Sequence, residues 1–130
     1  MSRLARRLRG LMRRKKAPDL STGNAAPNPR QAAKERREAT VSYVRDFIRT
    51  RVGVEAYIEP ATAATSATLL LIATTGEWTR RAVPSEEAGW MLARDMEIPV
   101  YDVLKTGYPP RMRAWTRRRR GEARRRPGGR

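Results

Sequence analysis

The positive charge of this chain lies at its two ends, and this segregation limits where a folded core can form. Residues 1–16 carry eight Lys and Arg and no acid (+8), while residues 105–130 carry eleven against one acid (+10). Residues 17–104 carry ten basic and twelve acidic side chains (−2), so the ends account for the whole excess in a net charge of +16. At 130 residues the chain has the length of one domain. We therefore expect a single core between two basic arms.

The apolar pattern of the centre predicts a small α+β domain. Its elements follow the order helix, three strands, helix and strand, at 31–51, 52–59, 67–73, 77–83, 85–96 and 98–103. The second strand is a continuous apolar run that suits a central position. Pro99 places the last strand at an edge, because proline has no N–H to donate, and Ser85 is the expected N-cap of the second helix. We expect a mostly antiparallel sheet with helices on one face.

The core is expected to span residues 31–104. Residues 17–30 collect three prolines and a glycine with Ser, Thr and Asn, which predicts a linker. The first arm, 1–16, has apolar residues at helical spacing among its arginines, but an isolated helix this short is marginal in water. We expect this arm to become ordered only when it binds an anionic partner. The second arm, 105–130, contains a candidate basic helix at 111–126, which we expect Gly121 to interrupt.

The chain contains no His and no Cys. These absences remove the side chains most used for acid–base catalysis near neutral pH and for binding transition metals. We therefore expect a non-catalytic protein with no cofactor, no metal and no small-molecule substrate. Glu55, Tyr57 and Glu59 share one face of a strand and could hold Mg²⁺ or act as an acid–base pair. Exposure to solvent, or pairing with Arg80 or Arg81 across the hairpin, is the expectation we favour.

The longest apolar run, residues 69–73, is far shorter than the ~20 residues that span a membrane. The start of the chain lacks the apolar segment of a secretory signal. We therefore expect a cytoplasmic protein. An Arg-rich, acid-free start also fits an organellar transit peptide, although targeting would not explain the basic C-terminal end.

The arginine-rich arms predict a polyanion partner. Guanidinium groups pair bidentately with phosphate, and blocks of like charge usually meet an opposite charge. Solvated tails that only raise solubility are the alternative, and an anionic membrane surface is the second partner that a basic amphipathic segment could bind. The expected nucleic-acid-binding residues are Arg3, Arg6, Arg7, Arg9, Arg13, Arg14, Lys15, Lys16, Arg111, Arg113, Trp115, Arg117, Arg118, Arg119, Arg120, Arg124, Arg125 and Arg126.

Two aromatic residues among these arginines, Tyr108 and Trp115, bear on which polyanion is bound. Bases of single-stranded or looped RNA stack on such rings. Alternatively, both rings fold back and cover the sheet, which a small core favours because it needs its aromatic side chains. Both interpretations stay open from sequence alone.

The order helix, three strands, helix over 31–96 resembles the double-stranded RNA-binding domain. That family meets phosphates with a lysine-rich start of its second helix, whereas this chain has Ser85-Glu86-Glu87 there, so no contact is carried over. The segments RTRVGVEAYIEP (49–60), GEWTRRAVPS (76–85) and IPVYDVLKTGYPPRMR (98–113) are similar to a group of small actinobacterial proteins, some of them labelled oxidoreductases. This resemblance implies a compact α+β unit. No G-x-G-x-x-G follows a predicted strand, so no redox site is carried over.

The sequence thus predicts a nucleic-acid-associated accessory protein that binds structured RNA, or a ribonucleoprotein such as the ribosome, ahead of DNA. The arms supply affinity, and the core supplies shape and a contact with a protein partner in the ribonucleoprotein. The alternative is a module whose α+β core itself docks onto a protein or an anionic membrane.

Overall fold

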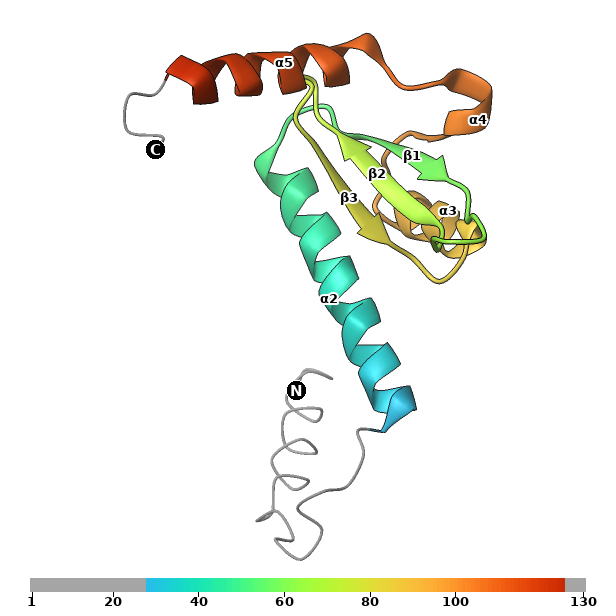
Figure 1. Cartoon of the computed structure of the whole chain (residues 1–130). Coiled ribbons are helices and arrows are strands. Elements are labelled where there is room, and N and C mark those ends of the chain that lie inside the picture. The colour runs from blue at the N-terminus through green and yellow to red at the C-terminus, as the bar shows by residue number, and fades with distance from the viewer. Residues whose placement is uncertain (1–27, 126–130) are drawn as a thin grey trace, which may run out of the picture. The chain divides into compact units, whose positions relative to one another are not determined.

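A computed structural model of the chain describes residues 28–125 (Figure 1). The predicted arm 1–16 and nearly all of the linker 17–30 lie outside the described residues. The chain divides into two compact units between Ala32 and Ala33. The unit described below is the second, which begins at Ala33, within the first described helix. The elements are α2 (Pro29–Thr50), β1 (Glu55–Glu59), β2 (Thr68–Ile72), β3 (Trp78–Ala82), α3 (Glu86–Asp95), β4 (Val100–Asp102), α4 (Val103–Thr106) and α5 (Pro110–Arg125).

The four strands form one mixed sheet in the order β3-β2-β1-β4. β1 pairs with β2, and β2 with β3, in antiparallel orientation, whereas β1 pairs with β4 in parallel. The α+β class, the element order up to β4 and the mostly antiparallel sheet are confirmed. The apolar strand β2 is internal, and β4 is an edge strand that follows Pro99, whose carbonyl accepts a hydrogen bond from the Ala56 N–H at 2.8 Å.

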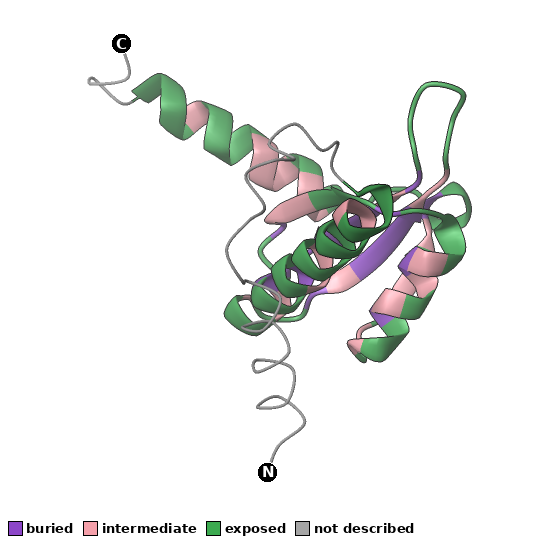
Figure 2. Ribbon diagram, turned by 90° about the horizontal axis from the view of Figure 1, so that it is seen from below, coloured by how far each residue is buried: buried purple, intermediate pink, exposed green. Residues whose placement is uncertain are grey.

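The first face of the sheet is covered by α2 and α3. Alternate strand residues, Ala56, Ile58, Leu69 and Leu71, are buried there with Val44 and Phe47 of α2 and Ala93 of α3. In Figure 2 the buried positions are purple and lie along the strands and on turns of the helices. The predicted N-cap is confirmed, because the Ser85 hydroxyl accepts a hydrogen bond from the Ala88 N–H at 3.1 Å.

The second face of the sheet is also covered, so the expectation of helices on one face has to be extended. Tyr57, Leu70 and Ile72 are buried on this face, with Val103 of α4. Trp78 and Met112 of α5 pack against the same cluster. The segment 110–125, expected as part of a basic arm, is therefore a helix that packs on the domain, and it continues through Gly121 without a break.

The start of the first strand differs from the expectation for a reason of backbone geometry. The first strand starts at Glu55 and not at 52, because Gly53 has a φ of 63° and turns the chain, which leaves Val52 81% exposed. In α3, Met91 is exposed and the buried residues are Gly89 and Ala93. A β-carbon at Gly89 would lie 2.8 Å from Ile58 Cδ1. The helix therefore approaches the sheet through its smallest side chains.

The turn between β2 and β3 lies directly beneath α5. Gly76 has a φ of 93° there, and its N–H donates to the Ala73 carbonyl at 2.9 Å. A β-carbon on Gly76 would lie 2.1 Å from the Arg111 carbonyl oxygen and 2.9 Å from Trp115 Cβ. Glycine is thus required both by the left-handed backbone and by the close approach of α5.

We predict that Gly76→Ala lowers the free energy of unfolding by about 3 kcal/mol, because it adds backbone strain to a clash with the α5 backbone. Urea unfolding followed by circular dichroism measures this change. Gly121→Ala is the matched control: apart from its chain neighbours and the backbone of its own helix, no atom lies within 4 Å of its new β-carbon. Alanine in place of glycine in a helix raises stability by about 0.5–1 kcal/mol. Equal stability of the Gly76→Ala variant and the parent would contradict the close packing of α5 on this turn.

Candidate functional site

Helix α5 is anchored to the sheet along one of its sides. The Arg111 guanidinium forms an ion pair with Glu55 on β1 and donates to the Ala73 carbonyl at 3.1 Å. The Trp78 indole N–H on β3 donates to the Thr116 hydroxyl at 3.0 Å. Arg118 donates to the Thr75 carbonyl at 2.9 Å. Two of the predicted binding arginines are therefore engaged within the fold, and they set the position of the helix (Figure 1).

The solvent side of α5 carries a row of arginines, which we call the arginine stripe: Arg113, Arg117, Arg120 and Arg124. Their spacing of four, three and four residues places them on one helix face, over about 16 Å at a rise of 1.5 Å per residue. All four side chains are exposed. No carboxylate in residues 28–125 forms an ion pair with any of them.

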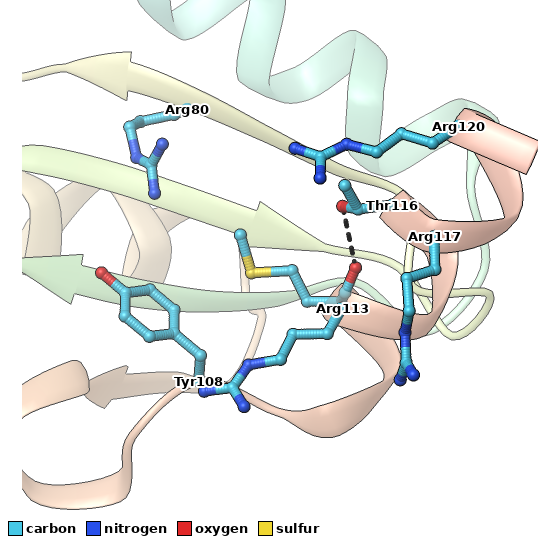
Figure 3. Close-up of a pocket in the computed structure, with 7 residues that line it drawn as sticks. Arg80, Tyr108, Arg113, Thr116, Arg117 and Arg120 are labelled. Carbon is cyan, nitrogen blue, oxygen red and sulfur yellow. Dashed lines mark hydrogen bonds between the residues drawn. The ribbon is translucent and has the colours of Figure 1, made fainter. Parts of the chain in front are cut away.

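A groove of about 520 Å³ lies between α5 and the second face of the sheet. Its walls come from β3, from the loop before α5 and from α5 itself. The lining residues are Arg80, Tyr108, Met112, Arg113, Thr116, Arg117 and Arg120. Figure 3 shows three of the stripe arginines projecting from α5, with Arg80 on its strand and Tyr108 on its loop opposite them. The groove thus combines guanidinium groups with one aromatic ring.

Arg80 and Tyr108, which line this groove, both belong to a hydrogen-bonded cluster around Glu59. The Glu59 carboxylate accepts two hydrogen bonds from Arg80, at 2.6 and 3.0 Å, and one from the Thr68 hydroxyl at 2.7 Å. The Tyr108 hydroxyl donates to the same carboxylate. The predicted pairing of Glu59 with Arg80 is confirmed. Because this pair is internally neutral, the excess positive charge of the groove comes from α5.

These contacts set the protonation of the cluster. Burial of the Glu59 carboxylate raises its pKa, but the hydrogen bonds from Arg80, Tyr108 and Thr68 outweigh burial and lower the pKa below its ordinary value of 4.5. The hydrogen bond to Glu59, together with burial, raises the pKa of Tyr108 above its ordinary value. Glu59 is therefore ionised and Tyr108 protonated at neutral pH, which keeps the Tyr108 ring in place.

The remaining predicted binding residues have different surroundings. Trp115 is half-buried, packs against the Gly76 turn and has the Arg119 guanidinium 5.5 Å from its ring centre. This matches the expectation that Trp115 folds back towards the sheet, whereas Tyr108 stays 42% exposed beside the groove. Arg125 is exposed. Outside the described residues lie Arg3, Arg6, Arg7, Arg9, Arg13, Arg14, Lys15, Lys16 and Arg126.

Sequence reasoning missed the part that the sheet contributes to the groove. Arg80 was considered only as a partner for an acid, and Met112 and Thr116 were not considered as groove residues. The position of Arg80 on the second face of the sheet could have been predicted, because Arg80 lies two residues after Trp78 on β3 and alternate residues of a strand share one face of the sheet. The distance in sequence between Arg80 and Tyr108 concealed their common contact with Glu59.

Comparisons of the chain with protein-family models, curated proteins and solved structures found no match. No described helix has the length and apolar content needed to cross a membrane. Within residues 28–125, no group of three or more His, Cys, Asp or Glu is arranged to hold a metal ion. The site is therefore interpreted from its own chemistry, which is that of exposed guanidinium groups on an anchored helix.

We predict that Glu59→Gln lowers the free energy of unfolding at pH 7 by about 1–3 kcal/mol, because charge-assisted hydrogen bonds to the carboxylate are weakened. Since the native pKa lies below 4.5, the carboxylate stabilises the fold above that pH, and this contribution is lost as pH falls through the native pKa. Urea unfolding from about pH 7 to about pH 3 should show parent and variant converging in acid. A difference that stays constant over this range would contradict the assigned ionisation.

Proposed function

We propose that this chain is a non-catalytic, cytoplasmic accessory protein that binds structured RNA, free or within a ribonucleoprotein, through the arginine stripe of α5. The observation that carries the proposal is the orientation of the stripe. Four exposed guanidinium groups share one face of a helix whose other side is hydrogen-bonded to the sheet. Guanidinium pairs bidentately with phosphate oxygens, so this face suits a sugar–phosphate backbone.

The electrostatics of α5 also favour an anionic partner. Neighbouring stripe residues are separated by three or four positions, and like charges at these spacings destabilise a helix by about 0.2–0.5 kcal/mol per pair. The first turn of α5 contains no acid, although acids are favoured there by the helix dipole. A phosphate backbone against the stripe would relieve this repulsion. The helix is held by tertiary contacts in spite of its charge, which supports a role for the charge itself.

Anchoring also lowers the entropy that binding must remove. A free basic peptide loses backbone freedom when it orders on nucleic acid, at about 1–2 kcal/mol per residue. Residues 110–125 are already helical, so only their side chains have to be ordered. The basic residues outside the described part of the chain would add affinity through the same counterion release.

The packing of α5 also decides how the proposal can be tested. Removing residues after 108 would take away Met112, which packs against the buried cluster that contains Leu70 and Ile72, so loss of binding by such a fragment could result from unfolding. Charge substitutions on the solvent side of α5 avoid this difficulty. Anionic vesicles, the partner expected of a membrane-docking module, serve as the competing ligand in the same assay.

We predict that Arg113→Gln, Arg117→Gln and Arg120→Gln combined weaken binding of the full chain to a structured RNA. The slope of log K against log salt should become shallower by about three, since each phosphate contact contributes about one unit. Fluorescence anisotropy over a salt series measures the slope. Arg37→Gln, Arg45→Gln and Arg49→Gln on α2 form the control, because they remove the same charge from exposed positions.

An unchanged slope in the α5 variant, or an equal loss in the α2 control, would contradict binding through the stripe. Binding of the parent to anionic vesicles but not to RNA would support the docking alternative in its place.

A further inference from the structure

The groove beside the stripe has features that phosphate binding alone does not require. It places an aromatic ring, Tyr108, and a thioether, Met112, next to three guanidinium groups that have no ion-pair partner among the described residues. Its volume of about 520 Å³ lies within the ~300–1,000 Å³ of sites that hold small organic ligands. We propose that the groove is a subsite for one unpaired nucleotide, with the base on Tyr108 and the phosphate on Arg113, Arg117 and Arg120.

The Tyr108 ring is held in place before any ligand arrives. Its hydroxyl donates to Glu59, which is itself fixed by Arg80 and Thr68. Tyr108 as a residue nevertheless remains 42% exposed, and its side chain lines the groove. A fixed, exposed ring next to cationic groups is the arrangement on which unstacked bases bind in proteins that recognise single strands. The base therefore stacks without first ordering the side chain.

The charges of the groove are distributed to receive a phosphate on the α5 side. Glu59 would repel an anion, but its carboxylate accepts hydrogen bonds from Arg80, Tyr108 and Thr68 and is largely screened by them. The charge of Arg80 is neutralised by its ion pair with Glu59. The three stripe arginines that line the groove thus supply its uncompensated charge, and a phosphate binds there while the base lies towards Tyr108.

The groove offers little that could read the identity of a base. The Thr116 hydroxyl accepts from the Trp78 indole and donates to the Met112 carbonyl at 3.1 Å, so its proton and one of its two lone pairs are already used. Stacking and charge tolerate all four bases. We expect a preference for unpaired over paired nucleotides, because a base in a duplex must first be unstacked and unpaired to reach the ring. We expect only a weak preference among bases.

This inference rests on the proposed function for its main source of nucleotide, an unpaired position within a bound RNA. A free nucleotide has the same chemistry, so the experiment contains an arm for each source. The probes are a short single-stranded RNA, a blunt RNA duplex with the same number of phosphates, and adenosine 5′-monophosphate alone. Each is titrated against the full chain at one salt concentration and then over a salt series.

The decisive pair of variants is Tyr108→Leu and Tyr108→Phe. Both remove the hydrogen bond to Glu59, but only the leucine removes the ring, so any effect of the lost hydrogen bond is common to the two. We expect Tyr108→Leu to weaken binding to the single strand about tenfold more than Tyr108→Phe does, in line with the loss of one base–aromatic stack. Binding to the duplex should be the same for both variants. Thermal unfolding of the two variants checks that each retains the fold.

Equal binding of the two variants to every probe would overturn the nucleotide subsite. In that case salt-dependent binding of RNA by the parent would still support the proposed function, so the two failures can be distinguished. If the parent binds neither RNA, but binds the free nucleotide in a way that depends on the ring, the proposed function fails and the subsite stands with a free nucleotide as its occupant.

Discussion

The contact of Arg111 with Glu55 and the Ala73 carbonyl joins helix α5, which carries the arginine stripe, to the sheet. Both the fold and the proposed function depend on this junction. It joins α5 to the first residue of the internal strand β1, close to the turn at Gly76. Without a helix in this place, the cluster that contains Leu70 and Ile72 would lose its contact with Met112, and full burial of an apolar side chain of this size contributes about 1.5–3 kcal/mol. The arginine is half-buried, so its carbon stem packs while its charge is paired.

Docking gives the basic helix two chemically different sides. On the sheet side, Arg111, Thr116 and Arg118 hydrogen-bond within the domain. On the solvent side, the arginine stripe has no ion-pair partner among the described residues. Between the two sides, the Glu59 cluster closes one wall of the groove with a neutral ion pair and an aromatic ring. The arginines of α5 point to all sides of the helix, but docking leaves only some of them free on the solvent side, next to the Tyr108 ring.

The sheet could be predicted from the sequence to a large extent, whereas the position of α5 could not. Alternation, the Ser85 cap and Pro99 predicted the order of the elements along the chain and the edge position of β4, because these signals are local. The order β3-β2-β1-β4 and the parallel pairing of β1 with β4 were not predicted. The continuous apolar strand at 67–73 also carried an unused signal: a strand buried on both faces needs cover on both. The segment 110–125 was not recognised as the helix that covers the second face, because Met112 and Trp115 are its only large apolar residues among many arginines. The groove was missed because Arg80, Tyr108 and Glu59 meet only through tertiary structure.

Hydrogen exchange of the α5 backbone amides in the free protein tests the central claim most directly, because protection reports the free energy of local opening. If α5 is docked as described, the amides of residues 115–118 exchange slowly, with protection close to that of β2. Exchange of these amides at the rate of an unstructured peptide, while β2 remains protected, would show that the basic segment is a free arm, and would contradict the account.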